Sequence, residues 1–364
     1  MALSSSKIEI SDSLESLMEL RGDWENIFSL CGEPSVFLTW EWVFTWADYF
    51  MNGRRNLFIM VVREDEKVVG IAPWYIERGK AGSFGVRVLR FLGTPEGGSD
   101  YLDVLSLPGQ EEKVALSIHE FLFKKGRRIW DFTEFQDVNP DSLFFHNFIT
   151  RQDEEGRFFE IKRGAYCPRI DLPEKSEDYF DSLSRNRRQQ FKRHLRILQD
   201  GGGVEHETHK KIDDISFFHD FMLLYQKRWG GGNPAFPGFI EAVFHRLSEK
   251  GRAQLDFIRK DGSFVAGILH LQAGKRRDYY MMAADRSFSN RMSIGNVIIG
   301  LSIMNAINDG CNTYDFLKGD EAYKFSWAKG GTQLLTYFFF KKTPGALLRI
   351  TLDSLKNVGK AWLR

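Results

Sequence analysis

The segment 314–327 reads Tyr-Asp-Phe-Leu-Lys-Gly-Asp-Glu-Ala-Tyr-Lys-Phe-Ser-Trp and gathers carboxylates with a phenol. Asp315, Glu321 and Tyr323 are groups that can take a proton from an attacking nucleophile or return one to a leaving group. An ammonium must lose a proton before it attacks a carbonyl carbon, and a carboxylate whose pKa is raised by burial can accept it. We therefore predict acid–base chemistry at these three residues. Asp131 matches Asp315 in an earlier, similar segment, so a structural role for both aspartates is the alternative.

A second polar segment leads into a helix predicted at 293–308. A helix N-terminus carries unpaired N–H groups and a partial positive charge, which suits a pyrophosphate. Ser293 and Gly295 would let such a group approach the backbone, and Arg286 and Arg291 add charge. The predicted phosphate-binding residues are Arg286, Arg291, Ser293, Ile294, Gly295 and Asn296. An ordinary serine-capped helix is the alternative.

A helix predicted over 184–199 is strongly basic. Arg185, Arg188 and Lys192 share one of its faces, at i, i+3 and i+7, and no acidic residue interrupts the run. Arg187 and Arg193 extend this band, which could hold the 3′-phosphate of CoA, a nucleotide-sugar diphosphate or an anionic lipid. A solvated helix face has the same pattern.

Five further residues are candidates for acceptor binding. Lys318, Lys324 and Trp327 could pair with a phosphate or stack on a sugar. Asp100 and Asp103, in a glycine-rich loop, could orient sugar hydroxyls or bind a cation. A commonplace hairpin loop is the alternative for the two aspartates.

The elements that must position these residues occur twice along the chain. A helix at 111–125 is followed by a strand at 129–135, and a helix at 293–308 is followed by a strand at 313–317. A strand–turn–strand precedes each copy, with turns at 64–66 and 260–262. We infer a duplicated α/β (α+β) fold, in which each lobe has a mixed, mostly antiparallel sheet flanked by helices.

The repeat sets the expected domain boundaries. Residues 1–165 form a degenerate first lobe, and residues 166–344 form the lobe that carries the predicted chemistry. Residues 345–364 form an amphipathic helix packed on the second lobe, with an interfacial membrane helix as the alternative. Between the lobes, residues 136–175 should contain only short elements.

Bulk properties exclude several classes. The 50 basic and 49 acidic residues cancel, which argues against DNA as a partner. The 3 cysteines are widely spaced, and neither a signal peptide nor a transmembrane stretch is evident, so a cytoplasmic protein is expected. His206 and His209 lack a third ligand nearby, so no metal is expected.

The 314–327 segment resembles the C-terminal signature of CelD-type acetyltransferases, a branch of the GNAT superfamily. The segments Phe37–Trp42 and Asp100–Asp103 and the basic helix also match this family, so the resemblance covers nearly the whole chain. Such proteins have two GNAT-like lobes and are similar to the Fem-type aminoacyltransferases. The resemblance implies acetyl-CoA, or another acyl-CoA, as co-substrate. In these enzymes the phosphate loop reads Gln/Arg-x-x-Gly-x-Gly/Ala, of which Ser293-x-Gly295 survives here.

The predicted function is transfer of an acyl group from acyl-CoA, and the acyl group is expected to be acetyl. The acceptor would be an amine or hydroxyl group of a sugar, or of a precursor of the cell envelope or of a polysaccharide. Two alternatives stay open. One is a Fem-type transferase that takes its amino acid from aminoacyl-tRNA, the only case in which RNA is a partner. The other is a catalytically inactive scaffold of a polysaccharide synthesis or export system, peripheral at the inner face of the membrane.

Overall fold

The computed structural model describes residues 6–32, 34–79, 85–126, 128–210, 216–230 and 232–341, and structural statements concern these residues. The chain divides into two compact units. Unit 1 comprises Met1–Gly164 and Leu334–Arg364, and unit 2 comprises Ala165–Gln333. The predicted amphipathic helix at 345–364 lies outside the described residues.

Unit 1 contains two mostly antiparallel sheets, of strand order β1-β3-β4-β7 and β2-β5-β6-β8. Its helical segments are α1 (Leu14–Glu19), α2 (Arg21–Leu30), the 3₁₀ turn η1 (Val36–Leu38), α3 (Trp40–Phe50), α4 (Glu111–Glu120), the π-helical turn η2 (Phe121–Lys125) and α5 (Leu143–Glu154). Its strands are β1 (Lys7–Ser11), β2 (Arg55–Leu57), β3 (Ile59–Glu64), β4 (Lys67–Ala72), β5 (Trp74–Arg78), β6 (Arg87–Phe91), β7 (Leu105–Ser106), β8 (Phe132–Thr133) and β9 (Phe135–Val138).

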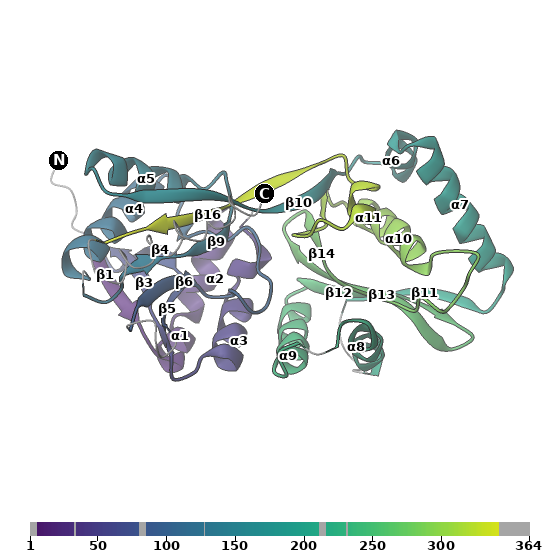
Figure 1. Cartoon of the computed structure of the whole chain (residues 1–364), viewed down its shortest axis with the longest axis horizontal. Helices are drawn as coiled ribbons and strands as arrows, with labels where there is room; N and C mark the ends of the chain where they lie inside the picture. Colours follow the sequence, from purple (N-terminus) through teal and green to yellow (C-terminus); the bar gives the residue numbers. More distant parts are fainter. Residues whose placement is uncertain are drawn as a thin grey trace, which may run out of the picture. The chain divides into compact units, whose positions relative to one another are not determined.

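Unit 2 is built on a sheet of order β11-β12-β13-β14-β15-β10. Its helices are α6 (Ser176–Ser182), α7 (Arg185–Asp200), α8 (Ser216–Trp229), α9 (Phe236–Glu249), α10 (Ile294–Asn308) and α11 (Ala322–Phe325). Its strands are β11 (Val204–His209), β12 (Ala253–Lys260), β13 (Ser263–Ala273), β14 (Arg276–Ala284) and β15 (Thr313–Asp315), while β10 (Phe159–Asp171) and β16 (Gly330–Phe339) continue from one unit into the other. Helices α8 and α9 cover one face of the sheet, and α10 and α7 cover the other (Figure 1).

The structure confirms the predicted α/β class with mixed, mostly antiparallel sheets flanked by helices. Matching features recur in the two units. The hairpins β3–β4 and β12–β13 each carry a register shift, at Val62/Arg63 and at Ile258/Arg259. A parallel pair follows in each, β6 with β8 and β14 with β15.

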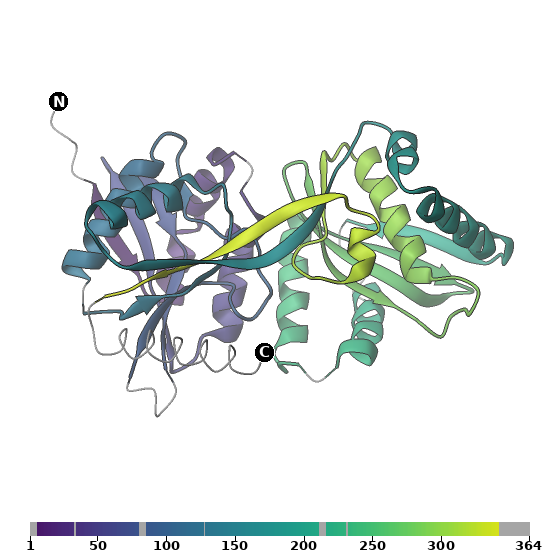
Figure 2. The same cartoon turned by 45° about the horizontal axis from the view of Figure 1, so that its top comes forward.

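Helix α10 is apolar around most of its circumference because it lies between the sheet and α7 (Figure 2). It begins at the Ser293 N-cap and ends before Gly310, whose φ of 76° suits a residue without a Cβ atom. Gly300 permits the close approach of α7, since a Cβ atom there would lie 2.2 Å from a ring carbon of Phe191.

Two segments differ from the sequence-based expectation. The strand predicted at 313–317 ends at Asp315, because Leu317 adopts a φ of 54° and the chain then turns toward α11. The segment 136–175, expected to hold only short elements, contains the 12-residue helix α5 and the 13-residue strand β10.

Candidate active site

A cavity of about 300 Å³ lies at the N-terminus of α10. It brings together six of the sequence-predicted residues, five from the donor set and one from the catalytic set. These are Arg286, Ser293, Ile294, Gly295, Asn296 and Tyr323. The other lining residues are Arg228, Met282, Ala284, Asp285, Met292 and Ile299. Arg291 lies outside the lining and is exposed.

The floor of this cavity is the first turn of α10. The Ser293 hydroxyl accepts a hydrogen bond from the Asn296 N–H at 3.4 Å, and the Ser293 N–H donates to Nδ1 of His194 at 3.4 Å. Burial, with Arg193 and Arg187 nearby, lowers the pKa of His194. His194 is therefore a neutral acceptor at physiological pH, and the positive character of the site comes from the helix terminus and from arginines.

Strand β14 forms one wall of the cavity. It pairs with β15 only from Arg276 to Asp278 and then runs on to Ala284 beside the cavity. Its pairing with β13 shifts at Tyr280, since Leu269 faces Met281 and His270 faces Tyr279. Such a bulge changes the direction of the local backbone N–H and C=O groups, and bulges are common beside active sites. Met282 and Ala284 supply an apolar surface.

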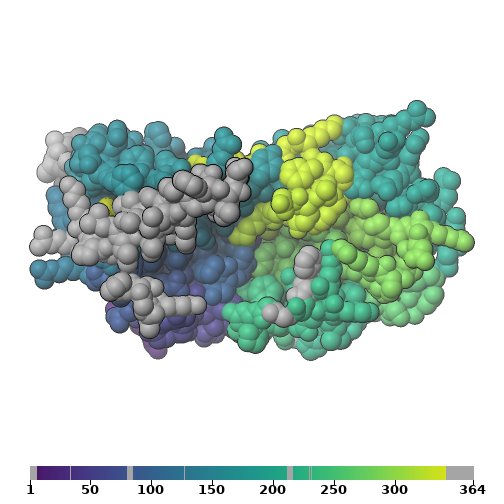
Figure 3. Space-filling model, viewed as in Figure 1, coloured from purple at the N-terminus to yellow at the C-terminus, as the bar shows by residue number. Residues whose placement is uncertain are grey.

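Tyr323 lies on α11 with its hydroxyl 3.1 Å from that of Tyr279. Burial raises the pKa of Tyr323, and it raises the pKa of Tyr279 well above the usual value. Both phenols therefore stay protonated at neutral pH. Tyr323, which lines the cavity, is suited to donate a proton. The α11 segment, yellow in Figure 3, reaches the surface of unit 2, where Phe325 is 49% exposed.

The two predicted carboxylates are not in the cavity lining. Asp315 is fully buried, and its Oδ1 accepts a hydrogen bond from the Leu317 N–H at 2.7 Å, which fixes the turn after β15. Glu321 forms an ion pair with Lys324 at 3.0 Å. The Lys324 ammonium is buried and also donates to the backbone oxygen of Lys318 at 2.8 Å.

The residues predicted to bind an anion on the basic helix α7 differ in their exposure and in their partners. Arg185 and Lys192 are exposed, whereas Arg188 forms an ion pair with Asp181 at 2.7 Å. Trp327 is buried, with 1% exposed, and the guanidinium carbon of Arg187 lies 4.3 Å from its ring centre.

The sequence predicts Arg187 only as an extension of the basic band, and not as a buried residue of a site. A signal for it existed in the sequence, since Arg187 lies 4, 7 and 11 residues before Phe191, His194 and Leu198, the buried face of the helix.

Asp100 and Asp103 belong to unit 1 and have partners there. Asp100 is buried, and its backbone oxygen accepts from the Ser35 hydroxyl at 3.0 Å. Burial raises the pKa of Asp103 to about 7, although the Ser142 hydroxyl at 2.6 Å and the Val104 N–H at 2.7 Å donate to its carboxylate.

The described residues contain no group of three or more His, Cys, Asp or Glu side chains that could hold a metal ion. Within the same residues, every helix is too short or too polar to span a bilayer.

Comparison with protein families gives a match over residues 185–325 to the family described as Acetyltransferase (GNAT) domain. The matched segment contains α10, β14, β15 and α11, the elements that form the cavity and its surroundings. No curated protein matches the sequence.

Solved structures resemble the whole chain at low identity. FemX is 14% identical with a TM-score of 0.60, over 90% of this chain and 98% of that one. L-PGS from Bacillus licheniformis is 10% identical with a TM-score of 0.56, over 93% and 95%. A conserved protein of unknown function from Bacteroides thetaiotaomicron is 13% identical with a TM-score of 0.54, over 92% and 100%.

These findings define the class of fold. The chain forms two compact units and shares its fold with FemX over 90% of its length, and residues 185–325, in the second unit, resemble a GNAT acetyltransferase domain. The finer resemblance to the CelD-type branch stays a prediction.

Proposed function

We propose that this protein is an acyltransferase that takes an acyl group from acyl-CoA, and we expect the donor to be acetyl-CoA. The acceptor would be an amine or hydroxyl group of a sugar, or of a precursor of the cell envelope or of a polysaccharide. The observation that carries the proposal is the cavity at the N-terminus of α10, where the residues predicted to bind a pyrophosphate meet a protonated phenol. Such an enzyme would work in the cytoplasm, where acyl-CoA is available.

The lining of this cavity fits the chemical parts of an acyl-CoA. The first turn of α10, through Gly295 and Asn296, and the guanidinium of Arg286 would hold the pyrophosphate. The apolar Met282 and Ala284 would contact the pantetheine arm. A donor bound in this way supplies the thioester, and the rest of the chemistry falls to the chain.

Two groups of the chain would act on the reacting atoms. A backbone N–H of the bulged segment of β14, Tyr280–Met282, would polarise the thioester carbonyl. Tyr323 would donate its phenolic proton to the departing thiolate, because burial keeps that phenol protonated. The acyl group would pass directly to the acceptor, so no covalent enzyme intermediate is needed.

Other sequence-predicted roles remain proposals. Asp315 supports the turn that leads to α11 and would thereby position Tyr323. Glu321 is the exposed carboxylate nearest along the chain to Tyr323 and is the candidate base for an ammonium acceptor. Roles for Lys318, Lys324, Trp327, Arg185, Arg188, Lys192, Asp100 and Asp103 in acceptor binding stay predictions.

A second candidate function is aminoacyl transfer from aminoacyl-tRNA. The similarity to FemX and the exposed cations of α7 support it. Binding of RNA through such a basic surface should weaken steeply as salt concentration rises, whereas binding of a small CoA ligand should depend on salt only modestly. The inactive-scaffold alternative predicts that neither ligand binds.

The first experiment is thermal unfolding with acetyl-CoA, free CoA and a nucleotide sugar. A ligand that binds only the native state at 100 times its Kd adds about 2.7 kcal/mol of stability. We expect both CoA species to raise the melting temperature. Ser293→Arg, which crowds the cavity, should abolish this rise without loss of the fold. No shift with any CoA would contradict the proposal and favour aminoacyl transfer or a scaffold.

A further inference from the structure

A second cavity, of about 490 Å³, lies along α7. Five of its lining residues come from α7 and the sixth follows α11 directly: Asn186, Arg187, Gln189, Gln190, Arg193 and Ser326. The lining contains two guanidinium groups and neutral polar groups, and no carboxylate. The electrostatic character of this cavity is therefore positive.

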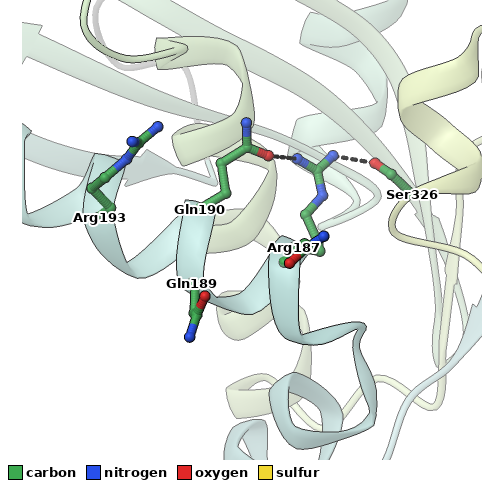
Figure 4. Close-up of a pocket in the computed structure, with 6 residues that line it drawn as sticks. Arg187, Gln189, Gln190, Arg193 and Ser326 are labelled. Atoms are coloured by element: carbon green, nitrogen blue, oxygen red, sulfur yellow. Dashed lines mark hydrogen bonds between the residues drawn. The ribbon is translucent and has the colours of Figure 1, made fainter.

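Arg187 is the buried residue in the lining of this cavity, whose other lining residues are exposed. Its side chain is buried, with 8% of the residue exposed, and its guanidinium lies between Gln190 and Ser326 (Figure 4). One terminal nitrogen donates to Oε1 of Gln190 at 3.1 Å, and the other donates to Oδ1 of Asn296 at 3.2 Å and to the Ser326 hydroxyl. Every one of these acceptors is uncharged.

The guanidinium of Arg187 thus carries a full charge without an anionic partner among the described residues. Burial lowers the pKa of Arg187, yet an arginine in a protein stays protonated at physiological pH. Its Nε atom is buried and has no hydrogen-bond acceptor in the described part of the chain. Contact with the Trp327 ring offsets a fraction of the desolvation cost. An unpaired buried charge is unfavourable, so the site is suited to an anion.

The surroundings favour a phosphate over a smaller anion. Arg193 adds a second guanidinium from the exposed side of α7, and the amide of Gln190, which lies beside the Arg187 guanidinium, adds a neutral donor (Figure 4). A guanidinium fork matches the geometry of phosphate oxygens, and a terminal phosphate carries close to two charges. Two cations with several donors therefore fit a phosphomonoester.

This cavity adjoins the one at the N-terminus of α10. Asn296 lines the donor cavity and accepts the hydrogen bond of Arg187, so one side chain connects the two. Ser326 lines the second cavity, and it follows Tyr323, which lines the first, by three residues. A ligand whose pyrophosphate binds at the N-terminus of α10 would thus place a further phosphate group near Arg187.

We propose that the Arg187 cavity binds the 3′-phosphate of the CoA donor and makes the protein discriminate CoA from 3′-dephospho-CoA. This inference rests on the proposed function, since it presumes a CoA donor. The sequence also predicts phosphate binding on α7, but on the face formed by Arg185, Arg188 and Lys192, with Arg187 and Arg193 only extending it; this inference moves the site to the buried Arg187.

The test is isothermal titration calorimetry of the full chain with CoA and with 3′-dephospho-CoA. We expect the wild-type protein to bind CoA at least about tenfold more tightly, a difference of about 1.4 kcal/mol. Arg187→Met should reduce this preference to less than about twofold through weaker CoA binding, with the affinity for dephospho-CoA retained. Arg196→Met is the matched control. It removes the same charge from an exposed position of the same helix, outside the cavity lining, and should keep the preference.

Two further measurements keep the inference falsifiable. Without ligand, Arg187→Met should melt at the same temperature as the wild type or higher, because it removes an uncompensated buried charge. Arg193→Gln, at an exposed position, should lower the preference for CoA by a smaller factor. Equal binding of CoA and dephospho-CoA by the wild type would overturn this inference and leave the proposed function intact. Binding of neither compound would overturn both.

Discussion

The close packing of α7 on α10 yields a quantitative prediction. A Cβ atom at Gly300 would lie 2.2, 2.6 and 2.7 Å from three ring carbons of Phe191. Ordinary carbon–carbon contacts are about 3.5–4.0 Å, so Gly300→Ala requires the ring to move by about 1 Å. Phe191 cannot move freely, because its ring stacks on Phe180 at 4.9 Å and meets Trp327 edge-on at 5.9 Å.

The expected magnitude combines two opposing effects. Overpacking a well-packed core costs about 1–3 kcal/mol. Alanine in a helix interior is more favourable than glycine by about 1 kcal/mol. Because the overlap is severe and the ring is held by two neighbours, the overpacking cost lies in the upper part of that range, about 2–3 kcal/mol, and we expect Gly300→Ala to lower the free energy of unfolding by about 1–2 kcal/mol. It should also weaken CoA binding, since a displaced α7 moves Arg187 away from Asn296.

The assay is urea denaturation followed by far-UV circular dichroism. Gly295→Ala is the matched control, because its Cβ atom would have its nearest contact at 3.6 Å, on Met282, and should leave stability equal or slightly higher. In a Gly300→Ala background, Phe191→Leu should cost less than it does alone, since the smaller side chain makes room. Equal stability of Gly300→Ala and wild type would refute the packing argument, as would additive losses in the double variant.

Three further predictions concern catalysis, the turn after β15 and pH. Tyr323→Phe should lower kcat of acyl transfer by about 10²-fold or more with little change in the Kd of the donor, measured by steady-state kinetics and calorimetry. Asp315→Ala should lower the free energy of unfolding by about 1–3 kcal/mol, because it leaves the buried Leu317 N–H without an acceptor, whereas Asp315→Asn should retain most of the stability. Burial lowers the pKa of His119 from 6.5 to about 4, so its stabilising effect is complete above pH 6.5 and is lost as the pH falls toward 4. Urea titrations at pH 7 and pH 4.5 should show a loss from this residue of about 2 kcal/mol, which His119→Leu removes.

Each of these three predictions has an outcome that would contradict it. Unchanged kcat in Tyr323→Phe would remove that phenol from the proton transfer. If Asp315→Asn reduced turnover strongly and left the melting temperature unchanged, Asp315 would be chemical and not structural. A pH dependence of stability in His119→Leu as steep as in the wild type would show that other groups cause it.

The duplicated fold was predictable because it depends on local pattern. Apolar periodicity marked α10, serine capping marked its start, and a glycine marked its end. The same pattern, an apolar-periodic helix that ends at a glycine and is followed by a strand, recurs at α4 and β8. The tandem architecture could therefore be predicted without knowledge of any contact. The match of residues 185–325 to a GNAT domain concerns the second of the two copies.

Local reasoning was wrong where tertiary context overrides propensity. The strand at 313–317 ends early because the buried Asp315 carboxylate holds Leu317 in a left-handed conformation. The 13-residue strand β10 carries mixed polar and apolar residues, and its partner β15 lies more than 140 residues further along the chain. Periodicity within one segment cannot reveal a partner that distant.

The sequence by itself determined the α/β class, the duplicated order of its elements and the helix N-terminus at Ser293, because capping and periodicity act over a few neighbouring residues. Only the tertiary structure decided which of the candidate site residues lie in the same cavity. It placed Tyr323 with Ser293 and Gly295 and left Asp315 and Glu321 outside that cavity. It also buried Arg187 against Trp327, 140 residues away, where the sequence showed only one more cation in a basic run. The reason is physical, since the burial and partners of a side chain depend on long-range packing that no local pattern records.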